Sequence, residues 1–352
     1  MNILVAMDKF KGSMTALVAG HAVECSLRKV VPQASVRVIG IADGGEGTVE
    51  ALGGEKVSCQ VLDAQGREIT ASYAWLPNDV AVMEMSAASG LALVSDLPLN
   101  PEMASTYGTG QLILHASQRG AKRIIIGIGG SATNDGGRGM AEALGFRFEG
   151  KAVTPPLSLH LPPIDVACDV DNPLLGPRGA TSVYGPQKGV IDIATFESRM
   201  SQFARMVAEH LGHDLSEVPG AGAAGGLGFG LMAFCGAKLL SGFDLVADVI
   251  GLQELVRSAN VVITGEGRLD EQSLMGKGPA GVAKMAKAAG ARVMGIAGSI
   301  QAADKLSVLF DHLLQIKPES MPVAEAMALG PKLIEQAMAE NEQELKKFFE
   351  VG

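Results

Sequence analysis

A short strand that leads into a glycine-rich loop and then a helix constrains the fold of this chain more than any other stretch. The β-branched run of residues 123–126 predicts a buried strand, and residues 138–144 read as a helix. Between them, residues 127–137 are Gly-Ile-Gly-Gly-Ser-Ala-Thr-Asn-Asp-Gly-Gly. Glycines let the backbone approach a ligand closely, and a helix start adds partial positive charge. The segment therefore indicates an α/β fold with an anion site, and a plain glycine-rich turn before a capped helix is the alternative.

The composition favours a globular protein of two α/β domains. The chain has 352 residues, which is long for one core, and 47% of them are hydrophobic against 19% charged. The net charge of −9, without a cluster of Lys and Arg among aromatics, makes nucleic acid and anionic membranes poor partners. No apolar run reaches the roughly 18 residues that a membrane helix needs. We expect no signal peptide, because the chain starts with a strand, and the four scattered cysteines fit a cytoplasmic location.

Two strands at the start of the chain end in polar loops. The predicted strand 3–7 leads into Asp8, and the predicted strand 36–41 leads into Asp43. In an open α/β sheet, ligands bind at the carboxyl ends of strands, so both loops should face one crevice. Each aspartate could also be a simple turn residue.

The pattern changes after residue 54 and returns near residue 245. Residues 56–62, 68–75 and 80–85 read as short strands of hairpins, which indicates a mixed sheet in a second domain inserted into the first. The βαβ pattern after residue 260 should complete the sheet begun at strand 3–7. We therefore expect a Rossmann-like domain of residues 1–53 and 245–352, with residues 54–244 as the inserted domain. The proline-rich connection 150–166 is predicted to be irregular.

Three later loops carry further candidates for phosphate and metal chemistry. Asp169 and Asp171 follow a predicted strand at 166–168, and paired carboxylates suit Mg²⁺, although an Asx turn before proline is the alternative. Lys188 stands in a glycine-flanked loop, from which its ammonium group could reach a phosphate. Residues 219–228 form a second glycine-rich run ahead of a predicted helix at 227–240. Its Gly-x-Gly-x-x-Gly spacing matches the dinucleotide fingerprint, but no strand precedes it, which argues against NAD binding.

Eight strings in the chain, taken together and in order, resemble the bacterial type I glycerate kinases. They begin with Asp8-Lys9-Phe10-Lys11-Gly12-Ser13, Ala42-Asp43-Gly44-Gly45-Glu46-Gly47-Thr48, Tyr107-Gly108-Thr109-Gly110 and the loop 127–137. The others are Ala167-Cys168-Asp169-Val170-Asp171-Asn172-Pro173, Gly185-Pro186-Gln187-Lys188-Gly189, the run 219–226 and the run 264–270. The resemblance covers nearly the whole chain, and eight motifs in the family's order are highly specific. The chain departs from the pattern in shorter segments after Ala51 and at 150–166, and in Met7 where a proline is expected.

The resemblance implies ATP-dependent phosphorylation of D-glycerate with Mg²⁺, generally at the 2-hydroxyl. It also implies two α/β domains, one inserted in the other, with the active site in the cleft between them. A homodimer is compatible with the sequence but not required by it. A nicotinamide-dependent hydroxy-acid dehydrogenase and a non-catalytic sugar-acid or nucleotide-binding protein are the alternatives. A dehydrogenase would need a dinucleotide fingerprint after strand 3–7, and this chain has none there. A non-catalytic binding protein would need fewer charged loop residues than this chain has.

Phosphoryl transfer depends on positioning and charge neutralisation, which suggests a role for each polar loop. A carboxylate must orient or deprotonate the glycerate hydroxyl, and the sequence does not choose between Asp43 and Asp171. The predicted catalytic residues are Asp171, Asp43, Lys188 and Arg268. The predicted substrate-binding residues are Asp8, Lys11, Ser13, Asp43, Glu46, Thr48, Glu266 and Arg268. The predicted ATP-binding residues are Gly129, Gly130, Ser131, Thr133, Asn134, Gly222, Gly225, Gly226 and Lys277, and the predicted magnesium ligands are Asp169, Asp171 and Asp135.

Overall fold

The chain folds into two compact α/β units. The computed structural model describes residues 1–42, 44–45, 47–275 and 278–350. Unit 1 comprises Met1–Asp43, Glu50–Leu52 and Val246–Gly352, and unit 2 comprises Gly44–Val49 and Gly53–Leu245. One sheet is parallel and the other is mixed, so the predicted fold class of two α/β domains is confirmed. The domain limits expected from the sequence stay a prediction.

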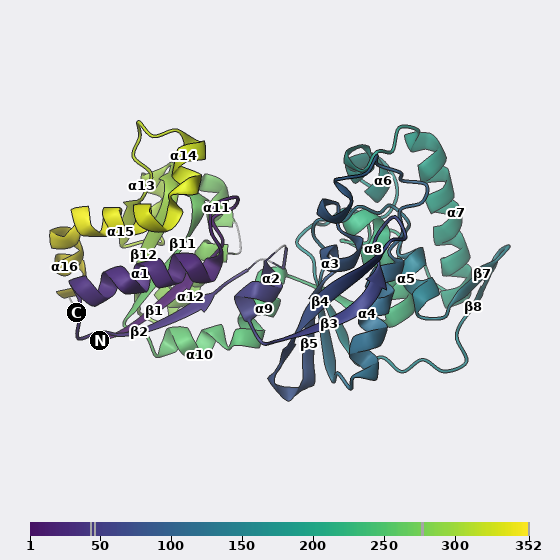
Figure 1. The fold of residues 1–352 in the computed structure, drawn as a ribbon, viewed down its shortest axis with the longest axis horizontal. Coiled ribbons are helices and arrows are strands. Elements are labelled where there is room, and N and C mark those ends of the chain that lie inside the picture. Colours follow the sequence, from purple (N-terminus) through teal and green to yellow (C-terminus); the bar gives the residue numbers. More distant parts are fainter. Residues whose placement is uncertain (43, 46, 276–277, 351–352) are drawn as a thin grey trace. The chain divides into compact units, whose positions relative to one another are not determined.

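Unit 1 is built on a five-stranded sheet in the order β13-β12-β11-β1-β2, in which every neighbouring pair is parallel (Figure 1). The strands are β1 (Asn2–Met7), β2 (Ser35–Gly40), β11 (Val261–Leu269), β12 (Arg292–Ile300) and β13 (His312–Gln315). Alternate residues of β1 point to opposite faces, and Ile3, Val5 and Met7 join one core cluster. Continuous apolar runs of this kind suit strands that are covered on both faces.

Helices cover both faces of the unit 1 sheet. The core cluster of Ile3, Val5 and Met7 includes buried residues of α1 (Ala16–Val30), α15 (Gly330–Glu340) and α16 (Glu342–Glu350). The helix α12 (Gly278–Ala288) packs against β1, β11 and β12. The shorter helices of this part of the chain are α9 (Gly242–Ile250), α10 (Leu252–Arg257), α11 (Glu271–Met275), α13 (Ala303–Leu306) and α14 (Val323–Ala328).

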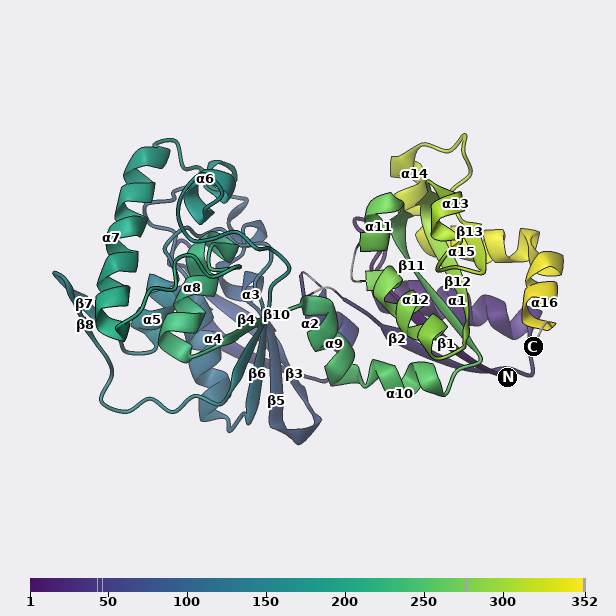
Figure 2. The same cartoon turned by 180° about the vertical axis from the view of Figure 1, so that it is seen from behind.

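Unit 2 is built on a six-stranded mixed sheet in the order β10-β9-β6-β5-β4-β3, seen from behind in Figure 2. The strand β4 (Glu68–Leu76) pairs antiparallel with both β3 (Glu55–Leu62) and β5 (Val80–Glu84). From β5 the sheet continues in parallel through β6 (Arg123–Gly127), β9 (Ile164–Ala167) and β10 (Lys238–Leu240). Its helices include α3 (Ser86–Ser89), α4 (Tyr107–Gln118), α5 (Arg138–Ala143), α6 (Ala180–Tyr184), α7 (Ile193–Leu211) and α8 (Ala223–Cys235). The short helix α2 (Thr48–Leu52) begins in unit 2 and ends in unit 1. The parallel strands place three carboxyl ends, those of β5, β6 and β9, along one edge of the sheet.

Three segments differ from the sequence-based prediction. The connection predicted as irregular contains β8 (Ala152–Thr154), which pairs with β7 (Arg147–Glu149) in a hairpin whose strands are too short to give a clear pattern. The helix predicted at 227–240 ends at Cys235, because Gly236 takes a left-handed backbone conformation (φ 61°) that closes it. The motif 264–270 lies almost wholly in a strand, because β11 runs to Leu269 and pairs in parallel with β12 up to Ile300. None of the helices in the described ranges is long and apolar enough to cross a membrane.

Candidate active site

The glycine-rich loop 127–137 lies between β6 and α5 and is held in place by Asp135. One carboxylate oxygen of Asp135 accepts hydrogen bonds from Thr106 N and Thr106 Oγ1 at 2.8 Å each and from Gly139 N at 3.1 Å. The other accepts from Gly137 N at 3.1 Å. Burial raises the pKa of Asp135 above its ordinary value, against the opposing effect of these hydrogen bonds. The carboxylate predicted to bind magnesium is therefore already engaged in fastening the loop to the start of α4.

The second glycine-rich run packs directly against this loop. Gly136 N donates to Gly225 O at 3.0 Å, and a Cβ at Gly225 would stand 1.9 Å from Thr133 O. Gly225 and Gly226 both have positive φ angles, of 70° and 89°. A side chain at Gly225 would clash as well as strain the backbone. The structure thus brings together two loops that the sequence separates by about ninety residues, with Thr133, Asn134 and Gly136 of the first against Gly225 and Gly226 of the second.

The two loops differ in exposure. Gly129 and Gly130 are exposed, whereas Gly222, Gly225 and Gly226 are buried. A Cβ at Gly222 would meet a backbone oxygen at 2.1 Å, and one at Gly226 would meet a backbone carbon at 2.7 Å. These buried glycines permit close backbone packing, while the exposed pair leaves the tip of loop 127–137 open to a ligand.

Lys188 is buried beneath the loop. Its side chain lies at the end of the short 3-10 helix η3 (Pro186–Lys188), and the residue is only 2% exposed. The ammonium group donates to Ser131 Oγ at 2.6 Å and to Thr133 O at 2.7 Å. Burial lowers the pKa of Lys188 to about 7, although the nearby Asp135 acts in the opposite direction. The predicted phosphate-contacting lysine therefore contacts the loop itself.

Two buried oxygens near Lys188 have no hydrogen-bond partner in the part of the chain that the structure describes. They are Thr133 Oγ1 and Asn134 Oδ1, while the amide nitrogen of Asn134 donates to Thr181 Oγ1 at 3.0 Å. An unsatisfied buried polar group costs about 1–3 kcal/mol, so such atoms mark places where a water or ligand group can bind. Thr181 was not predicted as a site residue, and its own segment carries no sequence signal that would have found it.

The predicted magnesium ligands Asp169 and Asp171 follow β9 and are both exposed. Asp169 Oδ1 accepts a hydrogen bond from Gly242 N at 3.2 Å. Both oxygens of Asp171 accept from Arg178 Nη2 at 2.9 Å, a pairing that the sequence analysis missed. Within the described ranges, no three His, Cys, Asp or Glu side chains gather as a ready-made metal cage. Mg²⁺ does not require one, because it is commonly held by one or two carboxylates together with phosphate oxygens and waters.

The segment of residues 44–45 and 47–49 joins the same edge of the unit 2 sheet. Glu84, the last residue of β5, accepts hydrogen bonds from Gly47 N and Val49 N at 3.0 Å each. A Cβ at Gly44 would stand 2.3 Å from Ala167 Cβ, at the end of β9. The segment is therefore packed at the carboxyl ends of β5 and β9, beside the start of loop 127–137. Glu84 had not been predicted, although its place at a strand end is a usable signal.

Thr48, predicted to bind substrate, is engaged within this segment. Its side chain is 1% exposed, and its hydroxyl donates to Gly45 O at 2.7 Å. The hydroxyl thus closes the turn before α2. The predicted residues Asp43, Glu46 and Lys277 lie outside the described residues.

The remaining predicted residues belong to unit 1, where Asp8 and Ser13 follow β1. Asp8 is buried, and its Oδ1 accepts from Lys9 N at 2.6 Å. Ser13 Oγ donates to Met327 O at 2.6 Å, whereas Lys11 is exposed. Ser13 therefore ties the loop after β1 to α14.

Arg268 borders a recess of about 620 Å³ at the end of the β11–β12 strand pair. Its Nε lies 2.9 Å from Asp270 Oδ2, and its Nη2 donates to Gln301 Oε1 at 2.9 Å. Glu271 and Ala302 complete the lining. Glu266 is partly buried on the same strand, two residues before Arg268.

The order of these segments is that of a known family. The model of the glycerate kinase family matches residues 3–157 and 155–345, which together span almost the whole chain. This chain belongs to the glycerate kinase family. The family predicted from the eight strings is thereby confirmed, and with it the prediction of an enzyme, a glycerate kinase.

Individual family members are similar over most of their length. The glycerate kinase of Halalkalibacterium halodurans is 45% identical over 366 residues, which cover 95% of this chain and 96% of the relative. The glycerate 2-kinase of Escherichia coli strain K12 is 41% identical over 339 residues, with 89% and 88% covered. A crystal structure from Salmonella typhimurium LT2, provisionally named glycerate kinase 2, is 37% identical with a TM-score of 0.88 over the full length of both chains. The family fold is therefore present from end to end in this chain, including the stretches that look short in its sequence.

Proposed function

We propose that this protein transfers the γ-phosphoryl group of ATP to D-glycerate with the help of Mg²⁺, at the 2-hydroxyl, giving 2-phospho-D-glycerate and ADP. One observation carries the proposal: in a glycerate kinase family chain, the two glycine-rich loops meet at the carboxyl end of a parallel strand, above a buried lysine. Ligands of open α/β sheets bind at this edge. The regiochemistry rests on the E. coli relative, which is named a glycerate 2-kinase.

The exposed tip of loop 127–137 is suited to the phosphates of ATP. Gly129 and Gly130 present backbone to solvent ahead of α5. Thr133 Oγ1 can donate a hydrogen bond to a phosphate oxygen, and Asn134 Oδ1 can accept one from a metal-bound water. We assign Gly225 and Gly226 to bracing this loop, since their close contacts include its backbone, whereas Gly222 packs against the backbone of Pro173 and Ala180. Lys277 remains a predicted phosphate contact.

Asp169 and Asp171 would hold Mg²⁺ together with the phosphates. Bound there, the ion would neutralise charge on the nucleotide during transfer. Asp171 must release Arg178 to do so, and both side chains are exposed, so little free energy holds them together. We assign Asp135 to positioning the loop rather than to the metal, because its two oxygens already accept four hydrogen bonds.

Glycerate needs a cation for its carboxylate and a carboxylate for its hydroxyl. We propose Arg268 and Lys11 for the first role, since both are exposed on the loops and strand ends of unit 1. Asp8, Glu266, Ser13, Glu46 and Thr48 remain the predicted supporting residues. Asp43 and Asp171 remain the two candidates for the base, and only mutation separates them.

A coupled assay of ADP release with D-glycerate, ATP and Mg²⁺, followed by phosphorus NMR of the product, tests the proposal. A 2-phosphoglycerate resonance supports it in full. A 3-phosphoglycerate resonance keeps the kinase and corrects the acceptor hydroxyl. Absence of turnover with D-glycerate, alongside turnover with another hydroxy acid, would show that D-glycerate is not the substrate. Cytoplasmic location stays a prediction, based on the scattered spacing of the four cysteines in the sequence.

A further inference from the structure

We propose that Arg67 is a positioning residue for the glycine-rich loop 127–137, acting through the intervening segment 89–96. The proposal rests on the proposed function only in taking this loop to bind ATP. Arg67 lies on the turn between β3 and β4 and contacts no predicted site residue in the interactions that the structure describes.

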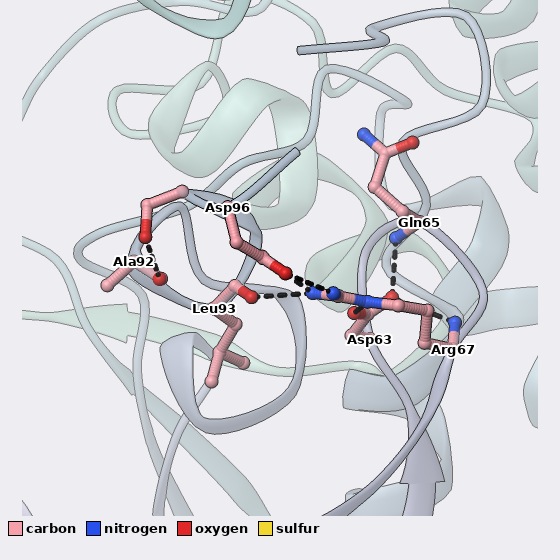
Figure 3. A network of polar contacts seen from close by, with 7 residues as sticks. Asp63, Gln65, Arg67, Ala92, Leu93 and Asp96 are labelled. Atoms are coloured by element: carbon pink, nitrogen blue, oxygen red, sulfur yellow. Dashed lines mark hydrogen bonds and ion pairs between the residues drawn. The ribbon is translucent and has the colours of Figure 1, made fainter. Parts of the chain in front are cut away.

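Arg67 joins the β3–β4 turn to the segment 89–96 (Figure 3). Its Nε donates to Asp63 Oδ2 at 2.5 Å, within the turn. Its Nη1 donates to Asp96 Oδ2 at 2.8 Å, and its Nη2 donates to Leu93 O at 2.7 Å. One planar guanidinium group therefore donates to three residues from two separate pieces of chain, which a lysine could not do with the same geometry.

The turn end of this network is rigid. Asp63 is 1% exposed, and its Oδ1 accepts from Gln65 N at 2.8 Å and Arg67 N at 2.9 Å. Burial acts to raise the pKa of Asp63, but the hydrogen bonds from Arg67 and Gln65 outweigh it and hold that pKa below its ordinary value. The exposed pair with Asp96 alone would be worth little, because both side chains reach solvent. The buried aspartate is what fixes the arginine and aims it at Leu93 and Asp96.

The other side of the segment 89–96 lies against the glycine-rich loop. Leu91 N donates to Gly130 O, and Ala132 N donates to Ser89 O, both at 2.9 Å. These bonds flank an antiparallel bridge between Gly90 and Ser131. Gly130 belongs to the exposed tip proposed to bind phosphates, and Ser131 is the residue to which Lys188 donates.

Apolar packing continues the same connection. Ala64, Val94 and Ala132 form a small buried cluster, with Leu91 packed against it. Each comes from a different piece: the turn, the segment and the loop. A shift of the segment would therefore move the loop, since hydrogen bonds and packed side chains link all three.

The expected consequence is a selective loss of ATP affinity. If losing the guanidinium lowers the population of the binding-competent loop to about a tenth, the apparent Kd and the KM for ATP rise about ten-fold. The KM for D-glycerate should change less than two-fold. A role confined to stability would lower the melting temperature and leave both KM values unchanged.

Three variants and a control make the test. Arg67→Gln should raise the KM for ATP about ten-fold, and Asp96→Asn about three-fold, because the bond to Leu93 O survives. The double variant should match Arg67→Gln alone, since the two residues act in one link. Arg119→Gln is the control: its side chain is 42% exposed against 39% for Arg67, and it pairs with Glu55 elsewhere on β3. Its KM for ATP should stay that of the wild type.

Hydrogen–deuterium exchange on the same variants gives a readout that does not depend on activity. Peptides spanning 89–97 and 128–134 should exchange faster in Arg67→Gln than in the wild type and Arg119→Gln, without ligand. Unchanged exchange there, or equal rises in the two KM values, would overturn the proposal. If the wild type failed to turn over glycerate, the proposed function would fall, while the exchange data would still decide whether Arg67 positions the loop.

Discussion

Replacing Lys188 by methionine should remove a pH dependence from the stability of unit 2. The lysine is 2% exposed, and its pKa falls from an ordinary 10.5 to about 7 because burial disfavours the ammonium form. In the folded protein the proton is released near pH 7, whereas the unfolded chain holds it to about pH 10.5. Between about pH 7 and 10.5 the unfolded state binds more protons than the folded state, so the free energy of unfolding rises with pH in this range. Below about pH 7 both states hold the proton, and this gain in the free energy of unfolding is absent.

The size of the effect follows from the difference between the two pKa values. A shift from 10.5 to about 7 corresponds to about 5 kcal/mol over the full window, at ~1.4 kcal/mol per pH unit. Between pH 7.5 and 9.0 the wild type should therefore gain about 2 kcal/mol relative to Lys188→Met. Methionine fills a similar volume without a titrating group. The other titrating groups are the same in both chains, so their contributions largely cancel in the difference.

Urea unfolding followed by the fluorescence of Trp75 measures this difference. Trp75 is the only tryptophan in the sequence, and it lies on β4, so the signal reports on unit 2. Lys122→Met is the control, because the Lys122 side chain is 75% exposed and its pair with Asp79 reaches solvent. The control should differ from the wild type by an amount that does not change over this pH range. The reasoning would be refuted if the difference in the free energy of unfolding between the wild type and Lys188→Met stayed constant to within about 0.5 kcal/mol from pH 7.5 to 9.0.

Three further changes test the site. Asp171→Asn should lower kcat about 100-fold or more without changing the free energy of unfolding, whereas Arg178→Gln should leave kcat unchanged. Wild-type turnover by a folded Asp171→Asn variant would exclude a base or metal role for Asp171. Gly225→Ala should abolish ATP binding measured by calorimetry, because the new Cβ would stand 1.9 Å from a carbonyl oxygen. Gly212→Ala is the control and should bind ATP normally, because Gly212 has a similar φ (79°) but its Cβ would meet nothing within 4 Å. Asp135→Asn should reduce the free energy of unfolding by about 2–4 kcal/mol, since its amide would face backbone N–H donors; a change below about 0.5 kcal/mol in urea unfolding would contradict the fastening role.

Most of the fold could be read from local patterns. The apolar runs at 3–7 and 123–126 predicted two strands that the structure contains, and the glycine-rich loop 127–137 precedes a helix as expected. The errors fall where a single residue or a short pairing decides the outcome. Gly236 ends α8 early, and the hairpin of β7 and β8 has strands of three residues each. Patterns that repeat over several residues are visible in a sequence, and single hydrogen-bonded pairs are not.

The sequence by itself determined which residues stand at strand ends, and its ordered motifs determined the family. It could not tell which of those residues face a ligand and which hold the loops in place. Asp135, Lys188 and Gly225 are residue types that are typical of a phosphate site. In the structure, Asp135 and Lys188 fasten loop 127–137, and Gly225 lets another loop pack against it. Glu84 and Arg67 carried no motif at all. Arg67 is 26 residues from its partner Leu93, and Glu84 is 37 residues from its partner Gly47. Such contacts depend on how the sheet brings distant segments to one edge, and only the tertiary structure decides that.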